Sequence, residues 1–282
     1  MSSTDSKRFF ITGVGSGFGL AFAKAALDAG HSTIGTVRKQ ETVGEFEALA
    51  PGRAAAIVLD VTDFDTIEKK IADAEGAIGP IDVLVNNAGY GHEGAMEESS
   101  LEEMRHQLDV NLFGAVALIK AVLPFMRRRR SGHIVNITSI AGLVGLPGIS
   151  YYAASKFALE GISEVLAKEL GPFGIKVTAV APGSFRTDWA GRSMVRSNRG
   201  IADYDDVFDP IRKARQDKSG HQPGDPRKAA RALLEIVASN DPPVHLLLGN
   251  DALQLMREKI KSLEHDMERW EALSRSTDFQ LG

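Results

Sequence analysis

The stretch Thr12-Gly13-Val14-Gly15-Ser16-Gly17-Phe18-Gly19 follows a short apolar run and precedes a segment with helical spacing of its apolar residues. Glycines at such a turn let the backbone bend tightly and approach a pyrophosphate closely. The helix that follows presents free N–H groups and the positive end of its dipole to the same phosphate. Glycines alone would also fit a plain turn, but the order of strand, turn and helix favours a nucleotide site.

On both sides of this turn, short apolar runs alternate with longer segments of helical periodicity. We expect strands at Arg8–Thr12, Thr33–Val37, Ala55–Leu59, Val83–Asn86, His133–Thr138, Lys176–Ala181 and Val244–Leu248. Helices are expected at Gly19–Ala29, Thr66–Gly76, Leu101–Arg128, Ala153–Leu170 and Asp225–Ser239. The strand runs are continuously apolar, as in parallel strands covered on both faces. The sequence therefore predicts an α/β fold, a doubly wound parallel sheet of seven strands (Rossmann-type) with helices on both faces.

Two segments depart from this alternation. The segment Ser184–Gly224 is long and has no clear strand, so we interpret it as a lid over a site. After the last strand, Asn250–Leu273 is expected to form one extra C-terminal helix. Its apolar residues recur in alternating steps of three and four, at Leu253, Met256, Ile260, Leu263, Met267 and Trp270. This stripe fits either a helix on its own domain or one that meets a partner chain. No break in composition marks a second domain, so residues 1–282 are expected to form one.

The composition excludes several classes of protein. A net charge of −4 without a basic excess does not favour nucleic acid as a partner, and the absence of cysteine excludes disulfides and thiolate metal sites. The seven histidines have no metal-ligand spacing, so no metal is expected. The N-terminus lacks the features of a signal peptide. No apolar run is long enough to be expected to cross a bilayer, and the best candidate, Phe113–Met126, is interrupted by Lys120 and Pro124. We therefore predict a cytoplasmic protein without a membrane partner.

A pair of residues suited to acid/base chemistry opens the helix after the fifth strand. Tyr152 and Lys156 are four residues apart, so on a helix they share a face, whereas Tyr151 has Ser155 at that spacing. An ammonium group beside a phenol favours the phenolate, so we expect Lys156 to lower the pKa of Tyr152. Ser139 lies at the end of the fifth strand, where its hydroxyl could hold a substrate oxygen. Thr138 beside it is the alternative.

These motifs and their order along the chain resemble those of the classical short-chain dehydrogenase/reductase (SDR) family. The resemblance extends from Arg8 to about Leu248. The resemblance implies hydride transfer between a nicotinamide cofactor and a carbonyl/alcohol substrate. It matches Ser139, Tyr152 and Lys156 to the catalytic residues, and Tyr152 and Lys156 also to cofactor contacts. Asn111 matches a catalytic asparagine that holds a water relaying protons to the lysine. The alternative interpretation of Asn111 is a purely structural one, a local hydrogen bond to the backbone within a helix.

Further positions resemble the family's cofactor contacts. The resemblance covers the residues of the glycine turn, Gly13, Ser16, Gly17, Phe18 and Gly19. It also covers turns that follow later strands: Asp60 and Val61 at the adenine ring, Asn87, Ala88 and Gly89 beside the adenosine, and Pro182, Gly183 and Thr187 at the nicotinamide. Considered alone, the Asn-Asn-Ala-Gly segment would indicate only a turn.

The end of the second strand bears on the choice of cofactor. A carboxylate there would accept hydrogen bonds from the ribose of NAD and repel a 2′-phosphate, but this chain has Val37 followed by Arg38. A guanidinium binds phosphate through two N–H groups, so NADP(H) is the preferred cofactor, with NAD(H) as the alternative. Ser16 weakens the prediction of NADP(H), because many NADP-preferring relatives carry a basic residue at this position. Arg38 and Lys39 could also be ordinary loop cations.

The lid and the segment before Tyr152 suggest the substrate. The lid contains Phe185, Trp189, Met194, Val195, Ile201, Tyr204, Val207 and Phe208, and the opposite wall could be Leu143, Val144, Leu146 and Ile149. Arg186 and Arg192 are the cationic exceptions. We expect a small-molecule substrate, a hydrophobic ketone, aldehyde or secondary alcohol. The alternatives are a nicotinamide-sensing regulator on the same fold and an SDR-fold dehydratase or epimerase. The resemblance also implies a homodimer or homotetramer formed through the helices Leu101–Arg128 and Ala153–Leu170.

Overall fold

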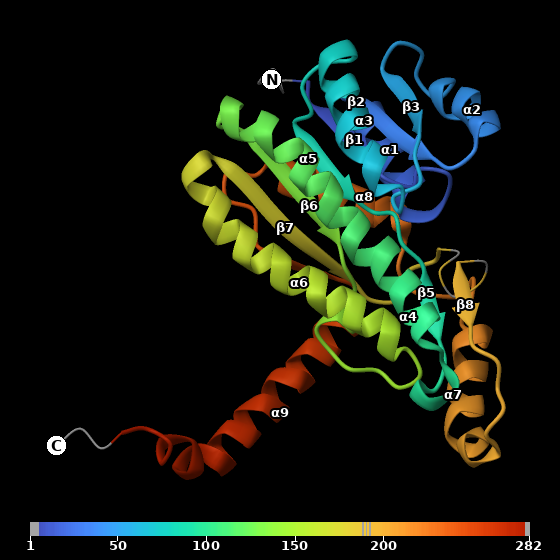
Figure 1. Ribbon diagram of the computed structural model, residues 1–282, viewed down its shortest axis with the longest axis vertical. Coiled ribbons are helices and arrows are strands. Elements are labelled where there is room, and N and C mark those ends of the chain that lie inside the picture. Colours follow the sequence, from blue (N-terminus) through green and yellow to red (C-terminus); the bar gives the residue numbers. More distant parts are fainter. Residues whose placement is uncertain (1–5, 188, 190, 192, 280–282) are drawn as a thin grey trace.

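The sheet of the computed structural model, which describes residues 6–187, 189, 191 and 193–279, confirms the predicted fold (Figure 1). Its seven parallel strands are β1 (Arg8–Ile11), β2 (Ser32–Val37), β3 (Ala54–Val58), β4 (Val83–Asn86), β6 (Gly132–Ile137), β7 (Ile175–Pro182) and β9 (His245–Leu248). Their order is β3-β2-β1-β4-β6-β7-β9. The direction of winding reverses between β1 and β4, and open α/β sheets bind ligands beyond the carboxyl ends of strands at such a point.

Helices cover both faces of the sheet because successive strand residues point to opposite sides. In β1, Phe9 and Ile11 enter one core and Phe10 enters the other. The first core is closed by α1 (Gly17–Asp28), α2 (Val43–Glu47) and α8 (Pro226–Ala238). The second is closed by α3 (Phe64–Ala77), α5 (Gly114–Arg129) and α6 (Ser150–Leu170).

The predicted helix Leu101–Arg128 is not continuous. It consists of α4 (Leu101–Leu108), a π-helical turn at Asp109–Phe113, and α5. By length and composition alone, the run Leu101–Arg129 could cross a membrane, so the expectation that no apolar run is long enough was wrong. Within the fold this run packs on α3, β4 and β6. The core helix of a soluble protein passes the same test of composition.

The segment expected to lack regular structure contains β8 (Met194–Arg196) and α7 (Asp205–Asp217), which corrects the sequence-based picture of the lid. β8 pairs in parallel with β5 (Gly91–Glu93), a short strand also missed from sequence, and both lie beside α7 at one end of the molecule (Figure 1). Three residues are too few for sequence periodicity to reveal either strand.

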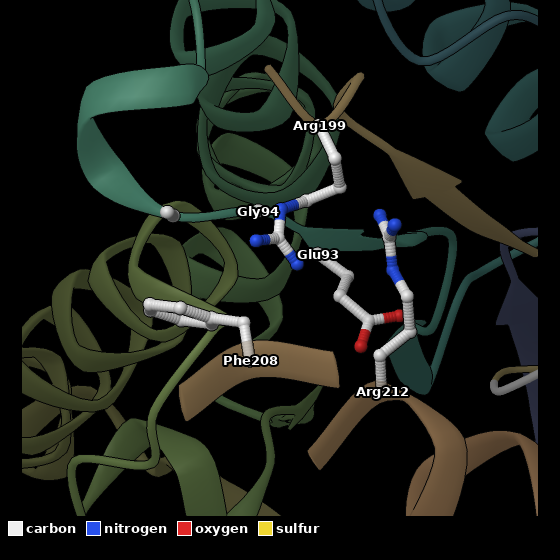
Figure 2. A pocket seen from close by; sticks show the side chains of 6 residues that line it. Glu93, Gly94, Arg199, Phe208 and Arg212 are labelled. Carbon is white, nitrogen blue, oxygen red and sulfur yellow. The ribbon is translucent and has the colours of Figure 1, made fainter. Parts of the chain in front are cut away.

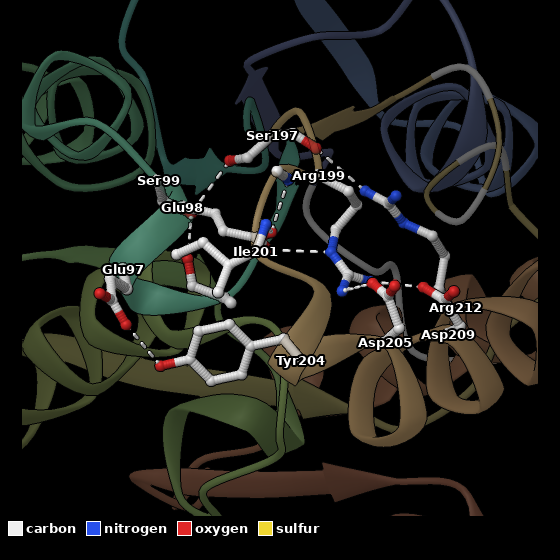
Figure 3. A network of polar contacts seen from close by, with 12 residues as sticks. Glu97, Glu98, Ser99, Ser197, Arg199, Ile201, Tyr204, Asp205, Asp209 and Arg212 are labelled. Carbon is white, nitrogen blue, oxygen red and sulfur yellow. Dashed lines mark hydrogen bonds and ion pairs between the residues drawn. The ribbon is translucent and has the colours of Figure 1, made fainter.

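Ion pairs hold this lid to the body. Arg199 of the lid forms an ion pair with Glu98 of the body and, within the lid, ion pairs with Asp205 and Asp209; the Oε1 atom of Glu98 also accepts hydrogen bonds from two backbone N–H groups of the lid (Figure 3). Glu93 faces the side chains of Arg199 and Arg212 in a small hollow of the surface beneath α7 (Figure 2). The lid is therefore a packed part of the fold.

The last helix, α9 (Asn250–Arg275), extends away from the body (Figure 1). Its first turn touches the sheet, where Ala252 is buried. From Ile260 to Phe279 every residue is exposed. Of the two interpretations of its apolar stripe, a helix lying on its own domain is therefore wrong for the second half of α9.

Candidate active site

The glycine turn lies between β1 and α1, at the carboxyl edge of the sheet. Gly13 and Gly17 have positive φ angles of 70° and 56°, a conformation that side chains other than glycine rarely adopt. A Cβ atom on Gly19 would lie 2.2 Å from the backbone oxygen of Gly13. All three glycines are thus required by the backbone path, which brings the start of α1 close under β1.

The N-terminus of α1 has no internal partner for its first N–H groups. Ser16 occupies the N-cap position without a side-chain hydrogen bond, and the first turn carries no acidic residue. Phe18 packs its ring on Phe22 and Phe185 at centroid distances of 5.4 and 5.2 Å, so only its backbone faces this end. Free N–H groups at an uncapped N-terminus bind phosphate, and the residues present therefore fit a dinucleotide.

The Asn-Asn-Ala-Gly segment is tied directly to the glycine turn. The buried Thr12 Oγ1 accepts hydrogen bonds from the backbone N–H groups of Asn87 (2.9 Å) and Ala88 (2.8 Å). The side-chain amide of Asn87 donates back to the carbonyl of Thr12 at 2.8 Å. This arrangement shows a structural role for the segment, since it fixes the loops after β1 and β4 to each other.

The predicted adenosine contacts lie at the ends of β2 and β3. The Oδ1 atom of Asp60 accepts hydrogen bonds from the N–H and hydroxyl of Thr62, which lower the pKa of the Asp60 carboxyl. Val61 is buried against Gly114. Arg38 is exposed and close enough for its charge to act on Asp60. Within the described residues its guanidinium has no ion pair, so it is free to meet an anion from solution.

The segment after β7 crosses over the glycine turn. Pro182 ends the strand, and Gly183 lies against the carboxylate of Asp251 at the start of α9, where a Cβ atom would be 2.3 Å from Oδ1. The same carboxylate accepts a hydrogen bond from the N–H of Ser184 at 2.7 Å. Thr187 then lies beside Gly17. The structure thus places the predicted nicotinamide contact next to the predicted phosphate site.

Tyr152 lies at the start of α6 in an apolar cluster. Its neighbours are Ala141, Ile149, Leu146 and Trp189, whose ring centroid is 5.0 Å from that of Tyr152. Burial raises the pKa of the Tyr152 phenol to about 12, although the Ser139 and Trp189 side chains act to lower it. The indole N–H of Trp189 nevertheless completes no hydrogen bond of normal geometry. The expectation of a lowered pKa is wrong for this arrangement, because loss of water outweighs the polar neighbours.

Lys156 is one helical turn away, and its side chain is buried beneath the site. Its Nζ atom donates to the backbone oxygen of Ile137 at 2.8 Å and lies 5.9 Å from the centroid of the Tyr152 ring. Burial lowers the pKa of Lys156 to about 8, and the negative charge of Glu160 opposes that shift. An ammonium this close to neutrality can exchange a proton near physiological pH.

The structure separates the two hydroxyl candidates at the end of β6. Thr138 is buried, and its Oγ1 donates to Glu160 Oε1 at 2.5 Å and lies 2.8 Å from the backbone oxygen of Val180. Ser139 is only partly buried, and its Oγ accepts a hydrogen bond from the N–H of Ala141. The hydroxyl of Ser139 thus remains able to donate toward Tyr152 and a substrate oxygen, whereas Thr138 is engaged in the core.

Glu160 is a site residue that the sequence reasoning missed. Its side chain is buried, and its Oε2 atom lies 2.7 Å from Nδ1 of His245 on the edge strand β9. A carboxylate buried in this way keeps its charge only with such partners. Its position four residues after Lys156 was the available signal, because the two residues share a face of the helix.

Asn111 lies in the π-helical turn and is fully buried. Its amide accepts a hydrogen bond from the N–H of Tyr90 and donates to the carbonyl of Tyr90 and to Ser155 Oγ, at 3.0 to 3.2 Å. The side chain therefore connects the segment after β4 to α6, close to Lys156. Its contacts reach farther than a local helix hydrogen bond.

Among the described lid residues, Trp189 contacts Tyr152, with the two ring centroids 5.0 Å apart. Phe185 packs into the core with Phe18, Met194 is buried in β8, and Val195 and Val207 are exposed. The interpretation in which lid residues tie the lid to the body thus holds for several of them. Arg186 donates to the carbonyl of Gln222. Arg192 lies outside the described residues.

The chain matches known proteins over most of its length. The family model described as short chain dehydrogenase matches residues 7–196. An oxidoreductase of Botryotinia fuckeliana, BOA17, is 38% identical over 95% of this chain and 98% of its own. The 3-ketodihydrosphingosine reductase of Bacteroides thetaiotaomicron is 40% identical over 89% of this chain and 91% of its own.

Solved structures agree with these matches. A short-chain dehydrogenase from Streptomyces avermitilis superimposes with a TM-score of 0.91 and 42% identity, covering 98% of this chain and all of that one. ElxO with NADP bound superimposes with a TM-score of 0.73 and 25% identity over 88% of this chain and 99% of its own. Together with the glycine turn and the Ser139, Tyr152 and Lys156 arrangement, these matches show that the chain belongs to the short-chain dehydrogenase family, whose members are NAD(P)-dependent oxidoreductases.

Proposed function

We propose that the protein transfers a hydride between NADP(H) and a hydrophobic ketone, aldehyde or secondary alcohol. The observation that carries the proposal is the position of Tyr152, whose phenol lies beside Ser139 within an apolar cluster capped by Trp189. A substrate whose carbonyl reaches this phenol must contact the surrounding apolar side chains. These contacts favour a substrate with apolar groups next to its carbonyl. The similarity to a reductase named for a long-chain ketone supports the same substrate class.

Each catalytic side chain has a role that follows from its environment. NADP(H), when bound, supplies or accepts the hydride. Ser139 donates a hydrogen bond to the substrate oxygen, and Tyr152 delivers a proton to that oxygen during reduction. With a pKa of about 12, the phenol is protonated at neutral pH and therefore ready to act as the acid. Lys156 supports the phenolate that results, and Asn111 is the proposed anchor of the route by which the proton is replaced.

The choice of NADP(H) over NAD(H) rests on the end of β2. The exposed guanidinium of Arg38 follows a buried Val37, so no carboxylate is present there to repel a 2′-phosphate. ElxO, a structural neighbour, was solved with NADP. Arg38→Asp should raise the Kd for NADPH about tenfold or more and leave that for NADH unchanged or improved. Lys39→Asp is the control, and a wild-type Kd for NADH equal to that for NADPH contradicts the preference.

The test of the chemistry compares two neighbouring buried tyrosines. Tyr152→Phe should reduce kcat by about two to four orders of magnitude while leaving NADPH affinity nearly intact. Tyr151→Phe removes only a hydrogen bond to the carbonyl of Ser99 and should retain activity.

The substrate class is tested by measuring NADPH oxidation with long-chain, aromatic and small polar ketones. Higher kcat/KM for the small polar ketones refutes the substrate class. Tight NADPH binding without turnover of any substrate would favour a sensing role instead.

The assembly is part of the proposal, together with a cytoplasmic location. Large apolar side chains remain exposed on the helices expected to form the subunit contact, including Phe113 at the π-helical turn and Phe157 and Val165 on α6. Such a face is typical of a surface that another subunit covers. We expect a homodimer or homotetramer, and a monomeric mass in light scattering at micromolar concentration contradicts it.

A further inference from the structure

Among the described residues, none buries the second half of α9. Leu263, Met267 and Trp270 are 46%, 64% and 52% exposed, and the polar residues around them are exposed as well. Figure 1 shows the helix extending away from the sheet and its covering helices. An isolated helix of this length is marginally stable in water, since most helical stability in proteins comes from packing of an apolar face. The exposed stripe therefore calls for a partner outside this chain.

The spacing of the stripe identifies the kind of partner. Leu253, Ile260 and Met267 occupy one heptad position, and Met256, Leu263 and Trp270 occupy the position three residues later. This alternation of three and four continues for about three heptads, which is the pattern of a coiled-coil seam. A seam of this kind complements a second copy of itself.

The charges beside the seam select an orientation. Arg257 and Lys259 flank its first half, whereas Glu264, Asp266 and Glu271 flank its second half. In a parallel pair, Lys259 would face Glu264 of the second copy, but Asp266 would face Glu271. In an antiparallel pair that matches Leu253 with Trp270, Lys259 faces Asp266 and Arg257 faces acidic residues of the second half. The antiparallel pair therefore brings opposite charges together without the repulsion between Asp266 and Glu271 that the parallel pair contains.

We propose that α9 is an assembly element that forms an antiparallel coiled coil with α9 of a second copy of this chain. The helix has 26 residues and is about 39 Å long, so the antiparallel arrangement keeps the two bodies at opposite ends of the pair. This contact is separate from any contact through α5 and α6. It does not depend on the proposed substrate or cofactor.

The polar face of α9 argues against a lipid surface as the occupant. Helices that lie on anionic membranes carry mainly Lys and Arg on their polar face. Here the outward positions combine both signs, with Glu258, Lys261, His265, Glu268 and Arg269. A mixed face of this kind gives no net attraction to anionic headgroups, whereas it suits the solvent side of a coiled coil.

The first experiment measures mass by light scattering over a range of micromolar concentrations. The double variant Ile260→Glu with Leu263→Glu places charges in the seam and should halve the mass of the full-length protein. Ser262→Glu with His265→Glu adds the same substituents on the outer side and should leave the mass unchanged. Since these residues are exposed, both variants should retain the NADPH affinity of the wild type. An unchanged mass for the seam variant overturns the proposal.

The second experiment tests orientation by disulfide formation, which is clean because the chain contains no cysteine. Met256→Cys and Met267→Cys lie opposite each other only in the antiparallel pair. An oxidised one-to-one mixture of the two variants should form a cross-linked heterodimer, whereas each variant alone should not cross-link. Cross-linking of each variant with itself overturns the antiparallel arrangement. Seam-dependent sedimentation with phosphatidylcholine–phosphatidylserine vesicles, without any change in mass, would identify a membrane as the occupant and overturn the proposal.

Discussion

Thr12 offers a sharp test of how the cofactor turn is held together. Thr12 is 1% exposed, and its hydroxyl oxygen accepts hydrogen bonds from the backbone N–H groups of Asn87 and Ala88. Thr12→Val preserves the shape of the side chain but removes the acceptor. The two N–H groups then remain in a half-buried turn without their partner, and nothing in the substituted side chain can replace it.

The size of the effect follows from those two hydrogen bonds. Leaving one buried donor unsatisfied costs about 1–3 kcal/mol, so two half-buried donors should lower the free energy of unfolding by up to about 6 kcal/mol. A stable domain has only about 5–15 kcal/mol in total, so the loss is large. For a chain of this size, about 4 kcal/mol corresponds to a decrease in Tm of roughly 8–16 °C. NADPH affinity should fall as well, because the glycine turn and the Asn-Asn-Ala-Gly segment lose their connection.

The matched control is Thr33→Val on the neighbouring strand β2. Thr33 is also 1% exposed, but its hydroxyl oxygen has no hydrogen-bond partner among the described residues. Its replacement by valine should leave stability unchanged or raise it slightly, because an unpaired polar group is removed from the core. Urea unfolding followed by circular dichroism measures both variants. Equal stability losses for the two would refute the reasoning.

Three further predictions concern Glu160, His133 and the glycine turn. Glu160→Gln removes the charge that raises the pKa of Lys156, so that pKa should fall below about 8. The alkaline limb of the kcat/KM profile should then move to lower pH. Glu164→Gln is the control, and an unchanged limb in Glu160→Gln contradicts the coupling. The pKa of His133 is lowered to about 4 by burial, so the unfolded chain binds the proton more tightly. Stability should therefore fall as pH decreases from about 6.5 to 4, by at most about 3 kcal/mol, and His133→Gln should remove that part of the slope in urea titrations. Gly19→Ala should abolish NADPH binding in calorimetry, because its Cβ would meet the oxygen of Gly13, whereas Gly15→Ala, with no atom within 4 Å of its Cβ, should bind normally.

The sequence by itself determined the features that depend on local pattern. Continuous apolar runs predicted all seven strands of the main sheet, because parallel strands covered on both faces must be apolar throughout. The glycine spacing predicted the turn, since its conformation is a property of those residues. The four-residue spacing of Tyr152 and Lys156 predicted that they share a face of α6, because helix geometry is regular.

The tertiary structure decided whatever depends on contacts between distant residues. The pKa of Tyr152 is raised because the folded chain buries its phenol, which the Tyr–Lys spacing could not reveal. Glu160 meets His245 across 85 positions of sequence, so no local pattern contained that pair. The heptad stripe of α9 was visible in the sequence, but only the folded chain showed that it faces solvent. Burial and charge pairing are properties of the packed molecule, and for this reason the chemistry of the site emerged only once the strands and helices were in place.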